Sequence, residues 1–216
     1  MDAGTLLKEA IEACRSLHDQ GLLAAADGNV SVRLGDGRIA ITPRGVPKAT
    51  LEPGDFAMLD LDGTILSGNP SSERLMHLAV YRAVPEARAV VHAHPVTAIA
   101  WSLANPDAAE LPSDALPEVI LAAGRIPLVP MATPGTEEMG TNLAPFLPAH
   151  RLMILARHGG LAWGGSIREA AGGIERLEQV AKILLAAQAF GGAKPLAASD
   201  LASLRALREK LGPGLL

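Results

Sequence analysis

The chain has 216 residues, of which 49% are hydrophobic and 3% are aromatic, and its formal net charge is -4 with a pI near 5.9. This size fits a single domain over residues 1–216, and the acidic balance with few aromatic side chains argues against a nucleic-acid or acidic-membrane surface. One cysteine excludes an internal disulfide, and without a basic leader or a long apolar run we expect a cytoplasmic protein outside the membrane.

Hydrophobic periodicity predicts a helix followed by two hairpins in the first third of the chain. Residues 5–20 carry apolar residues at helical spacing, and Gly21 ends the helix. Strands are expected at 30–34, 38–42, 56–61 and 64–66. The turn sequences Gly35-Asp36-Gly37 and Asp62-Gly63 lie between the members of each pair. Adjacent hairpins indicate an antiparallel sheet and, with no Gly-x-Gly-x-x-Gly in the chain, exclude a Rossmann unit.

Two loops in this region contain groups that suit a phosphate. Gly28 lets the backbone approach a ligand closely, and the Asn29 amide can donate to an oxyanion. Thr42-Pro43-Arg44-Gly45 adds a hydroxyl, a guanidinium and a glycine backbone. Each of these two sequences is also typical of an ordinary turn, and in that alternative Arg44 is simply solvated.

A serine pair and an acid introduce the next predicted helix. Ser71-Ser72-Glu73 precedes an apolar stripe that begins at Leu75. A helix start offers free N–H groups and a positive dipole end, to which the two hydroxyls add donors for a phosphate. Glu73 in the first turn could act as a base beside a metal ion. The alternative is that a serine caps the helix and Glu73 complements its dipole. In either case we expect His77, one turn after Glu73, to be an ordinary helical residue.

A His-x-His pair lies at the end of a predicted buried strand. Residues 89–93 are apolar and β-branched, and Pro95 closes the run. Side chains in a strand alternate, so His92 and His94 point the same way. Two imidazoles on one face can bind a metal ion, and a third ligand from elsewhere would leave one position open for substrate. The alternative is a pair of hydrogen-bonded histidines without a metal.

The second half of the chain is predicted to alternate helices and strands. Helices are expected at 97–103, from 136, from 166 to about 189, and from 199, and strands at 126–129 and 152–156. Residues 105–117 read as a loop, which Glu118 follows. His158 ends a strand beside two glycines and is the best candidate for a third metal ligand. Gly172 and Gly173 inside the long helix indicate close packing against another element.

Five motifs taken together resemble the class II aldolase/adducin family. They are Gly28-Asn29-Val30-Ser31, Thr42-Pro43-Arg44-Gly45, Ser71-Ser72-Glu73, His92-Ala93-His94 and His158-Gly159. Their common order is more specific than any one of them, and the resemblance spans roughly residues 5 to 190. Within the family, the chain looks most like the L-fuculose-1-phosphate aldolase branch.

The resemblance implies a fold, an assembly and a role for each motif. The fold would be α/β, a three-layer α/β/α sandwich around a largely antiparallel sheet, and the assembly a homotetramer with active sites between subunits. His92, His94 and His158 match the family's Zn²⁺ ligands, although Mn²⁺, Co²⁺ or Fe²⁺ could replace zinc. Glu73 matches its catalytic acid/base residue. The residues that match its substrate-phosphate cradle are Gly28, Asn29, Gly45, Ser71 and Ser72.

The implied activity is a metal-dependent aldolase. Its substrate would be a ketose 1-phosphate, either similar to L-fuculose 1-phosphate or a deoxypentulose 1-phosphate. Cleavage of this phosphorylated sugar would give dihydroxyacetone phosphate and an aldehyde. Arg44 replaces the small hydroxylic residue usual in the aldolase loop, and could strengthen phosphate binding or accommodate a carboxylate. The family's sugar-end tyrosine has no clear counterpart, because the only tyrosine is Tyr81 in the predicted helix. Glu118 falls near that position as a second acid/base group, unless it is a surface glutamate.

Other activities of the same fold stay open. A methylthioribulose-1-phosphate dehydratase shares the metal site, and a decarboxylase of sugar-acid phosphates is compatible with Arg44. A pentulose-phosphate 4-epimerase would be expected to carry Asp at position 73, so Glu73 favours the aldolase. A non-catalytic, adducin-like binding domain need not retain three histidines and the acid, all of which are present here.

Overall fold

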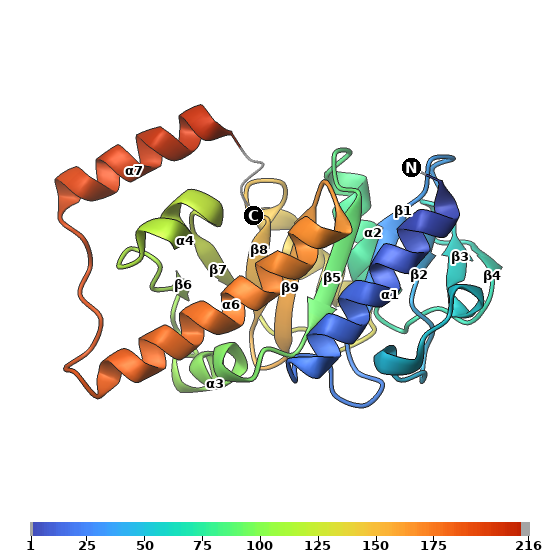
Figure 1. Cartoon of the computed structure of the whole chain (residues 1–216), viewed down its shortest axis with the longest axis horizontal. Coiled ribbons are helices and arrows are strands. Elements are labelled where there is room, and N and C mark those ends of the chain that lie inside the picture. Colours follow the sequence, from blue (N-terminus) through green and yellow to red (C-terminus); the bar gives the residue numbers. More distant parts are fainter. Residues whose placement is uncertain (1, 213–216) are drawn as a thin grey trace.

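The computed structural model describes residues 2–212 and contains one large sheet. Its strands are β1 (Asn29–Arg33), β2 (Ile39–Ile41), β3 (Ala57–Leu59), β4 (Ile65–Ser67), β5 (Ala89–Ala93), β6 (Glu110–Leu111), β7 (Ile126–Val129), β8 (Leu152–Leu155) and β9 (Gly159–Gly164). Within this part of the chain the nine strands follow the order β4-β3-β2-β1-β5-β9-β8-β7-β6 (Figure 1). All neighbours are antiparallel except β7 and β8. The expected α/β fold with a largely antiparallel sheet is therefore confirmed.

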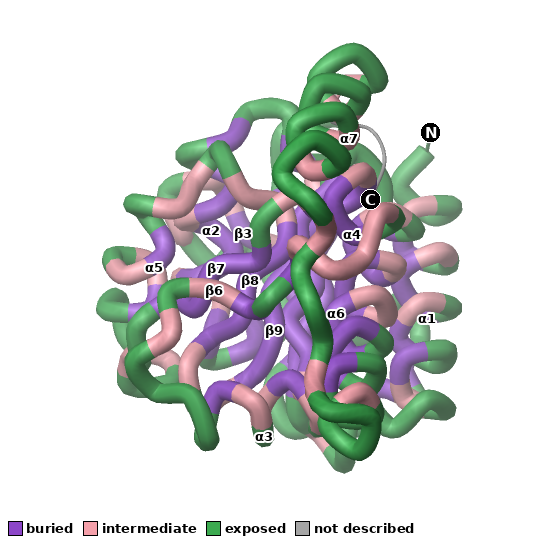
Figure 2. Tube along the Cα trace, turned by 90° about the vertical axis from the view of Figure 1, so that its left-hand side faces the viewer, coloured by how far each residue is buried: buried purple, intermediate pink, exposed green. Residues whose placement is uncertain are grey.

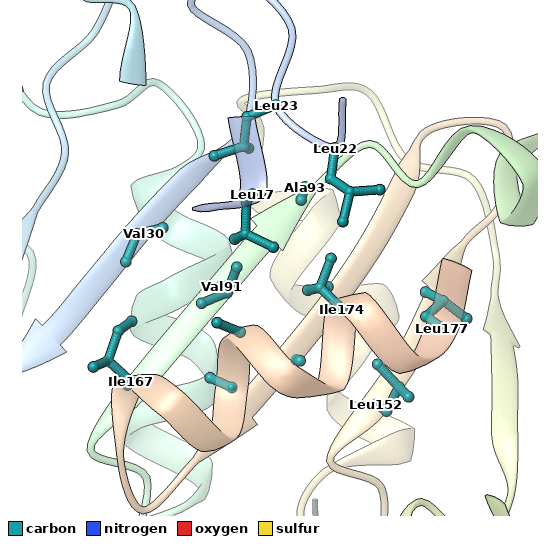
Figure 3. Close-up of a cluster of buried hydrophobic side chains, with 14 of the residues drawn as sticks. Leu17, Leu22, Leu23, Val30, Val91, Ala93, Leu152, Ile167, Ile174 and Leu177 are labelled. Atoms are coloured by element: carbon teal, nitrogen blue, oxygen red, sulfur yellow. The ribbon is translucent and has the colours of Figure 1, made fainter. Parts of the chain in front are cut away.

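Helices cover both faces of this sheet. They are α1 (Ala3–Asp19), α2 (Arg74–Ala83), α3 (Val96–Ala104), α4 (Pro117–Ala122), α5 (Glu137–Leu143), α6 (Ile167–Gln188) and α7 (Ala198–Leu211). Helices α1 and α6 pack on one face, in a core where Leu17, Val91 and Ile174 meet (Figure 3). Helices α2 and α5 contribute to a second core that includes Val90. Because Val90 and Val91 are adjacent in β5, the two cores lie on opposite faces of the sheet.

Several expected boundaries differ from the observed ones. The helix expected from Ser71 begins at Arg74. The loop expected at 105–117 contains the short strand β6, and Glu118 lies in the first turn of α4. A Cβ atom on Gly173 would lie 3.0 Å from Cβ of Ala162, which confirms close packing there. The same expectation is wrong for Gly172, whose Cβ would meet no atom within 4 Å.

Helix α7 contains no buried residue. Its backbone lies apart from the sheet and is largely exposed in Figure 2. Arg208 attaches it to the body by donating from Nη1 to the carbonyl oxygens of Leu121 and Ala122, at the end of α4. None of the described helices combines the length and apolarity that crossing a membrane requires.

Candidate metal and substrate site

Four segments that are distant in sequence meet where β1 and β5 pair. Asn29 pairs with His92 across these two strands, and Ala93 pairs with Gly160 of β9 on the other side of β5. The turn between β8 and β9 carries His158, and the start of α2 carries Glu73. Sheet pairing therefore positions the imidazoles, and the helix that crosses this face supplies the carboxylate.

His92, His94 and His158 form a cluster able to hold a metal ion. Their potential ligand atoms all lie within 4.8 Å of one another. Nδ1 of His92 lies 2.9 Å from the carbonyl oxygen of Gly160, which can only accept. Nδ1 therefore donates its proton, and Nε2 of the neutral ring presents a lone pair. Burial lowers the pKa of His92 to about 3 despite the opposing charge of Glu73, so this ring stays neutral near pH 7.

The spacing of these nitrogens fits a tetrahedral ion. Nε2 of His94 lies 3.2 Å from Nε2 of His92, and ligands about 2.0–2.1 Å from a tetrahedral Zn²⁺ are roughly 3.3 Å apart. Nδ1 of His94 lies 3.8 Å from a carboxylate oxygen of Asp27, which favours a proton on that nitrogen. Two lone pairs then face each other, an arrangement that a shared cation stabilises. The predicted ligand set therefore fits a divalent metal site.

Glu73 reaches directly into this cluster. Its Oε1 lies 3.1 Å from Nε2 of His158 and its Oε2 3.4 Å from Nε2 of His92. Burial alone would raise the pKa of this carboxyl, but the histidines and the Asn29 amide hold it well below its usual range. Glu73 occupies the N-cap position of α2 without a capping hydrogen bond from its side chain. The serine N-cap of the alternative interpretation is therefore not found at this helix, and the Glu73 carboxylate faces the histidines.

A cavity of about 250 Å³ opens beside the cluster. Its walls contain every residue expected in the phosphate cradle, together with two of the metal ligands and the acid: Gly28, Asn29, Arg44, Gly45, Ser71, Ser72, Glu73, His94 and His158. His92 is fully buried behind this wall. Arg44 and Ser72 are exposed at the cavity, whereas Ser71 is buried and accepts the backbone N–H of Glu73 at 3.3 Å.

Gly28 is required by its position in this wall. Its φ is +68°, and a Cβ atom there would lie 2.8 Å from the carbonyl oxygen of His92. A side chain would be strained and would collide with the strand that carries the ligand. Gly28 therefore permits a close approach of its backbone to β5, while the expected approach to a ligand stays a prediction.

The structure does not bring Glu118 to this site. It is exposed on α4, outside the cavity wall as formed by residues 2–212. Three residues that do belong to the site were missed or read as ordinary from the sequence. Lys48 is buried in the cavity wall, Asp27 faces His94, and His77 is buried beneath Asn29. His77 and Glu73 are four residues apart, but any two residues one helical turn apart share this spacing, so the sequence alone did not link them.

The sequence also matches a known family over most of its length. A model of the Class II Aldolase and Adducin N-terminal domain matches residues 8–185. The chain belongs to the class II aldolase and adducin family. Its family resemblance is thereby confirmed, and the ligand histidines, Glu73 and the cradle residues all lie within the matched range.

Individual relatives carry different activities in their names. The 3-oxo-tetronate 4-phosphate decarboxylase of Escherichia coli K12 is 34% identical over 206 residues, which cover 93% of this chain and 95% of that protein. An L-fuculose phosphate aldolase of Escherichia coli O6:H1 is 33% identical over 203 residues, which cover 93% of this chain and 92% of that protein. The crystal structure of YgbL from Escherichia coli has a TM-score of 0.88 and 33% identity, covering 94% and 99%. These identities do not single out the fuculose aldolase branch.

Proposed function

We propose that this chain is a metal-dependent lyase that decarboxylates a 3-oxo-tetronate 4-phosphate, giving carbon dioxide and dihydroxyacetone phosphate. The observation that carries the choice is the composition of the cavity wall. It contains a guanidinium, that of Arg44, and among the described residues no tyrosine. The 34% identity to a decarboxylase of this substrate supports the same choice.

The proposed reaction separates a carboxylate from a carbon next to a ketone. The bond between them breaks, carbon dioxide leaves, and the electron pair becomes an enediolate that takes one proton at carbon. A divalent ion bound by the three histidines would supply a Lewis acid for the ketone oxygen. An aldolase acting on a ketose 1-phosphate produces the same enediolate, so relatives with either activity can share one site.

The residues that line the cavity divide the remaining work. Backbone N–H groups near Gly28 and Gly45 and the hydroxyls of Ser71 and Ser72 would bind the phosphate. Glu73 has the carboxyl nearest the ligand nitrogens, and we assign it the transfer of a solvent proton to the enediolate carbon. Arg44 would bind the substrate carboxylate before it leaves.

Decarboxylation fits the wall better than aldol cleavage for a specific reason. Aldol cleavage needs a second group that takes the proton from the hydroxyl of the departing aldehyde, whereas loss of carbon dioxide does not. Tyr81 is 1% exposed and hydrogen-bonded in the interior, and Glu118 lies on α4 away from the wall.

The second candidate is the ketose 1-phosphate aldolase, favoured by the 33% identity to an L-fuculose phosphate aldolase. It would need a proton acceptor from another copy of the chain, and Glu118 is exposed and free to serve in that way. The homotetramer expected from the family resemblance would allow this arrangement. Loss of ketose cleavage in Glu118→Gln, with metal content unchanged, would support it.

The test compares three substrates on the metal-loaded protein. We expect equimolar carbon dioxide and dihydroxyacetone phosphate from 3-oxo-tetronate 4-phosphate, and loss of both on adding a chelator. Arg44→Thr should raise the KM for this substrate without loss of metal. Dihydroxyacetone phosphate from L-fuculose 1-phosphate, with no decarboxylation, would replace the proposal by the aldolase. A dehydrated product from methylthioribulose 1-phosphate alone would replace it by the dehydratase.

A further inference from the structure

A buried chain of hydrogen bonds runs from the interior to Glu73. The Tyr81 hydroxyl lies 2.9 Å from Oγ of Ser31, and Oγ lies 2.7 Å from Nδ1 of His77. Nε2 of His77 lies 2.5 Å from Oδ1 of Asn29, whose Nδ2 donates to Oε2 of Glu73 at 2.7 Å. Each of the four residues behind Glu73 is at most 2% exposed. The decarboxylation proposed above assigns a role to Glu73 and none to the four side chains behind it.

The direction of every hydrogen bond in it follows from the carboxylate. An ionised carboxylate only accepts, so the Asn29 amide must turn its NH₂ toward Glu73 and its oxygen toward His77. That oxygen requires a proton on Nε2 of His77. The ring is neutral, because burial lowers the pKa of His77 to about 4, so Nδ1 accepts from the Ser31 hydroxyl. Ser31 has then given its only proton, and Tyr81 donates to it.

Helix and strand geometry explain why the partners meet. Glu73, His77 and Tyr81 recur every four residues along the start and body of α2, a spacing of about 6 Å. Asn29 and Ser31 recur every two residues along β1, a spacing of about 6.7 Å. The two repeats nearly match, so successive side chains of the helix meet successive side chains of the strand. The contacts join residues 44 to 50 positions apart, which makes the chain a product of tertiary packing.

We propose that Asn29 and His77 are positioning residues whose aligned donors fix the Glu73 carboxylate in the orientation needed for proton transfer. Oε2 is occupied by the Asn29 amide, and Oε1 is left facing the metal ligand His158. The kinetic part of this inference rests on the proposed role of Glu73 as the proton-transfer group. The direction of the hydrogen bonds, by contrast, does not depend on which substrate the enzyme uses.

The alternative is that Asn29 and His77 only stabilise the fold, in which case a cavity elsewhere on α2 would affect activity as much as their loss. Aligned dipoles strengthen one another inside a protein, and partners of a ligand or acid commonly affect activity 10–100-fold. His77→Leu removes the donor to Asn29, whereas His77→Gln keeps an N–H near the position of Nε2. Leu78→Ala is the matched control, because it creates a cavity on the same helix outside the hydrogen-bond chain.

The kinetic test measures kcat, KM and metal content per folded protein. We expect His77→Leu to lower kcat about 10–100-fold with less change in KM, His77→Gln to recover most of it, and Leu78→Ala to leave it unchanged. Because His77 acts through Asn29, adding His77→Leu to Asn29→Ala should cause little further loss. Equal losses in His77→Leu and Leu78→Ala, or additive losses in the double variant, would overturn the positioning role.

A spectroscopic test needs no substrate. Nitrogen-15 NMR of histidine-labelled, metal-free protein distinguishes the two neutral imidazole tautomers. We expect His77, assigned by its loss in His77→Gln, to carry its proton on Nε2. A proton on Nδ1 would reverse the hydrogen bonds and overturn the inference. If the tautomer is as expected but 3-oxo-tetronate 4-phosphate is not turned over, the proposed substrate fails and the hydrogen-bond direction stands.

Discussion

Gly159 lies against His92 so closely that a Cβ atom on the glycine would be 2.8 Å from Cε1 of the imidazole. It would also lie 2.5 Å from the carbonyl oxygen of Ala93 and 3.0 Å from Cδ2 of His94. Two ligand rings and the strand that carries them thus occupy the space of the missing side chain. A side chain at position 159 would therefore disturb the histidine cluster, and Gly159 belongs to the candidate metal site without supplying a ligand atom.

Gly159→Ala is therefore expected to weaken metal binding. The methyl group must push His92 or His94 away from the shared position, and displaced ligands commonly cost about 10-fold or more in affinity. Competition with a chromophoric chelator at pH 7 measures the effect on Zn²⁺. Gly172→Ala, remote from the ligands, should bind zinc like the parent. Unchanged affinity in Gly159→Ala would mean that the three histidines do not hold the ion together.

Adjacent glycines in α6 should respond in opposite ways to alanine. A Cβ on Gly172 meets no atom within 4 Å, so Gly172→Ala should raise the free energy of unfolding by about 0.5–1 kcal/mol through reduced freedom of the unfolded chain. A Cβ on Gly173 would lie 3.0 Å from that of Ala162, so Gly173→Ala should lower the free energy of unfolding. Urea unfolding of the two variants and the parent measures both. The same sign in both would contradict the packing described here.

Burial of His77 makes stability depend on pH. The pKa of this ring falls from 6.5 to about 4 on folding, so the folded state excludes a proton that the unfolded chain binds. Stability is full above pH 6.5 and is lost as pH falls toward 4, by about 2 kcal/mol between pH 7 and pH 5. Urea unfolding of metal-free protein should show this loss of stability between pH 7 and pH 5. In His77→Gln the loss should be smaller by about 2 kcal/mol. An equal pH dependence in both proteins would show that His77 does not contribute.

Local patterns predicted the parts of the site that depend on one element. Alternation along residues 89–93 predicted that His92 and His94 share a face, and the turn signals predicted two hairpins that lead to an antiparallel sheet. The partners of Glu73 were not predictable in this way. His77 has the spacing of any helical residue, and only the packing of α2 on β1 brings it to Asn29. The family resemblance placed Glu118 near the sugar-end position, but α4 holds it at the surface.

Lys48 is another residue whose role depends on tertiary packing and could not be predicted from local sequence patterns. Lys48 is 1% exposed, and its ammonium donates to the carbonyl oxygens of Ala26 at 2.8 Å and Val46 at 2.9 Å. These carbonyls belong to the two loops that form the cavity wall around Gly28 and Gly45. Burial lowers the pKa of this lysine, while the charges of Cys14, Asp27 and Glu73 oppose that shift. The ammonium thus joins the loops expected to bind the phosphate.

Lys48→Met should therefore loosen the cradle. Two buried carbonyls lose their donor, which is expected to lower the free energy of unfolding by about 1–3 kcal/mol. The loops then separate more easily, so the KM for a phosphorylated substrate should rise more than kcat falls. Lys182→Met is the control, because that side chain is 57% exposed on α6. If Lys48→Met matches this control in both stability and KM, the ammonium does not hold the two loops together.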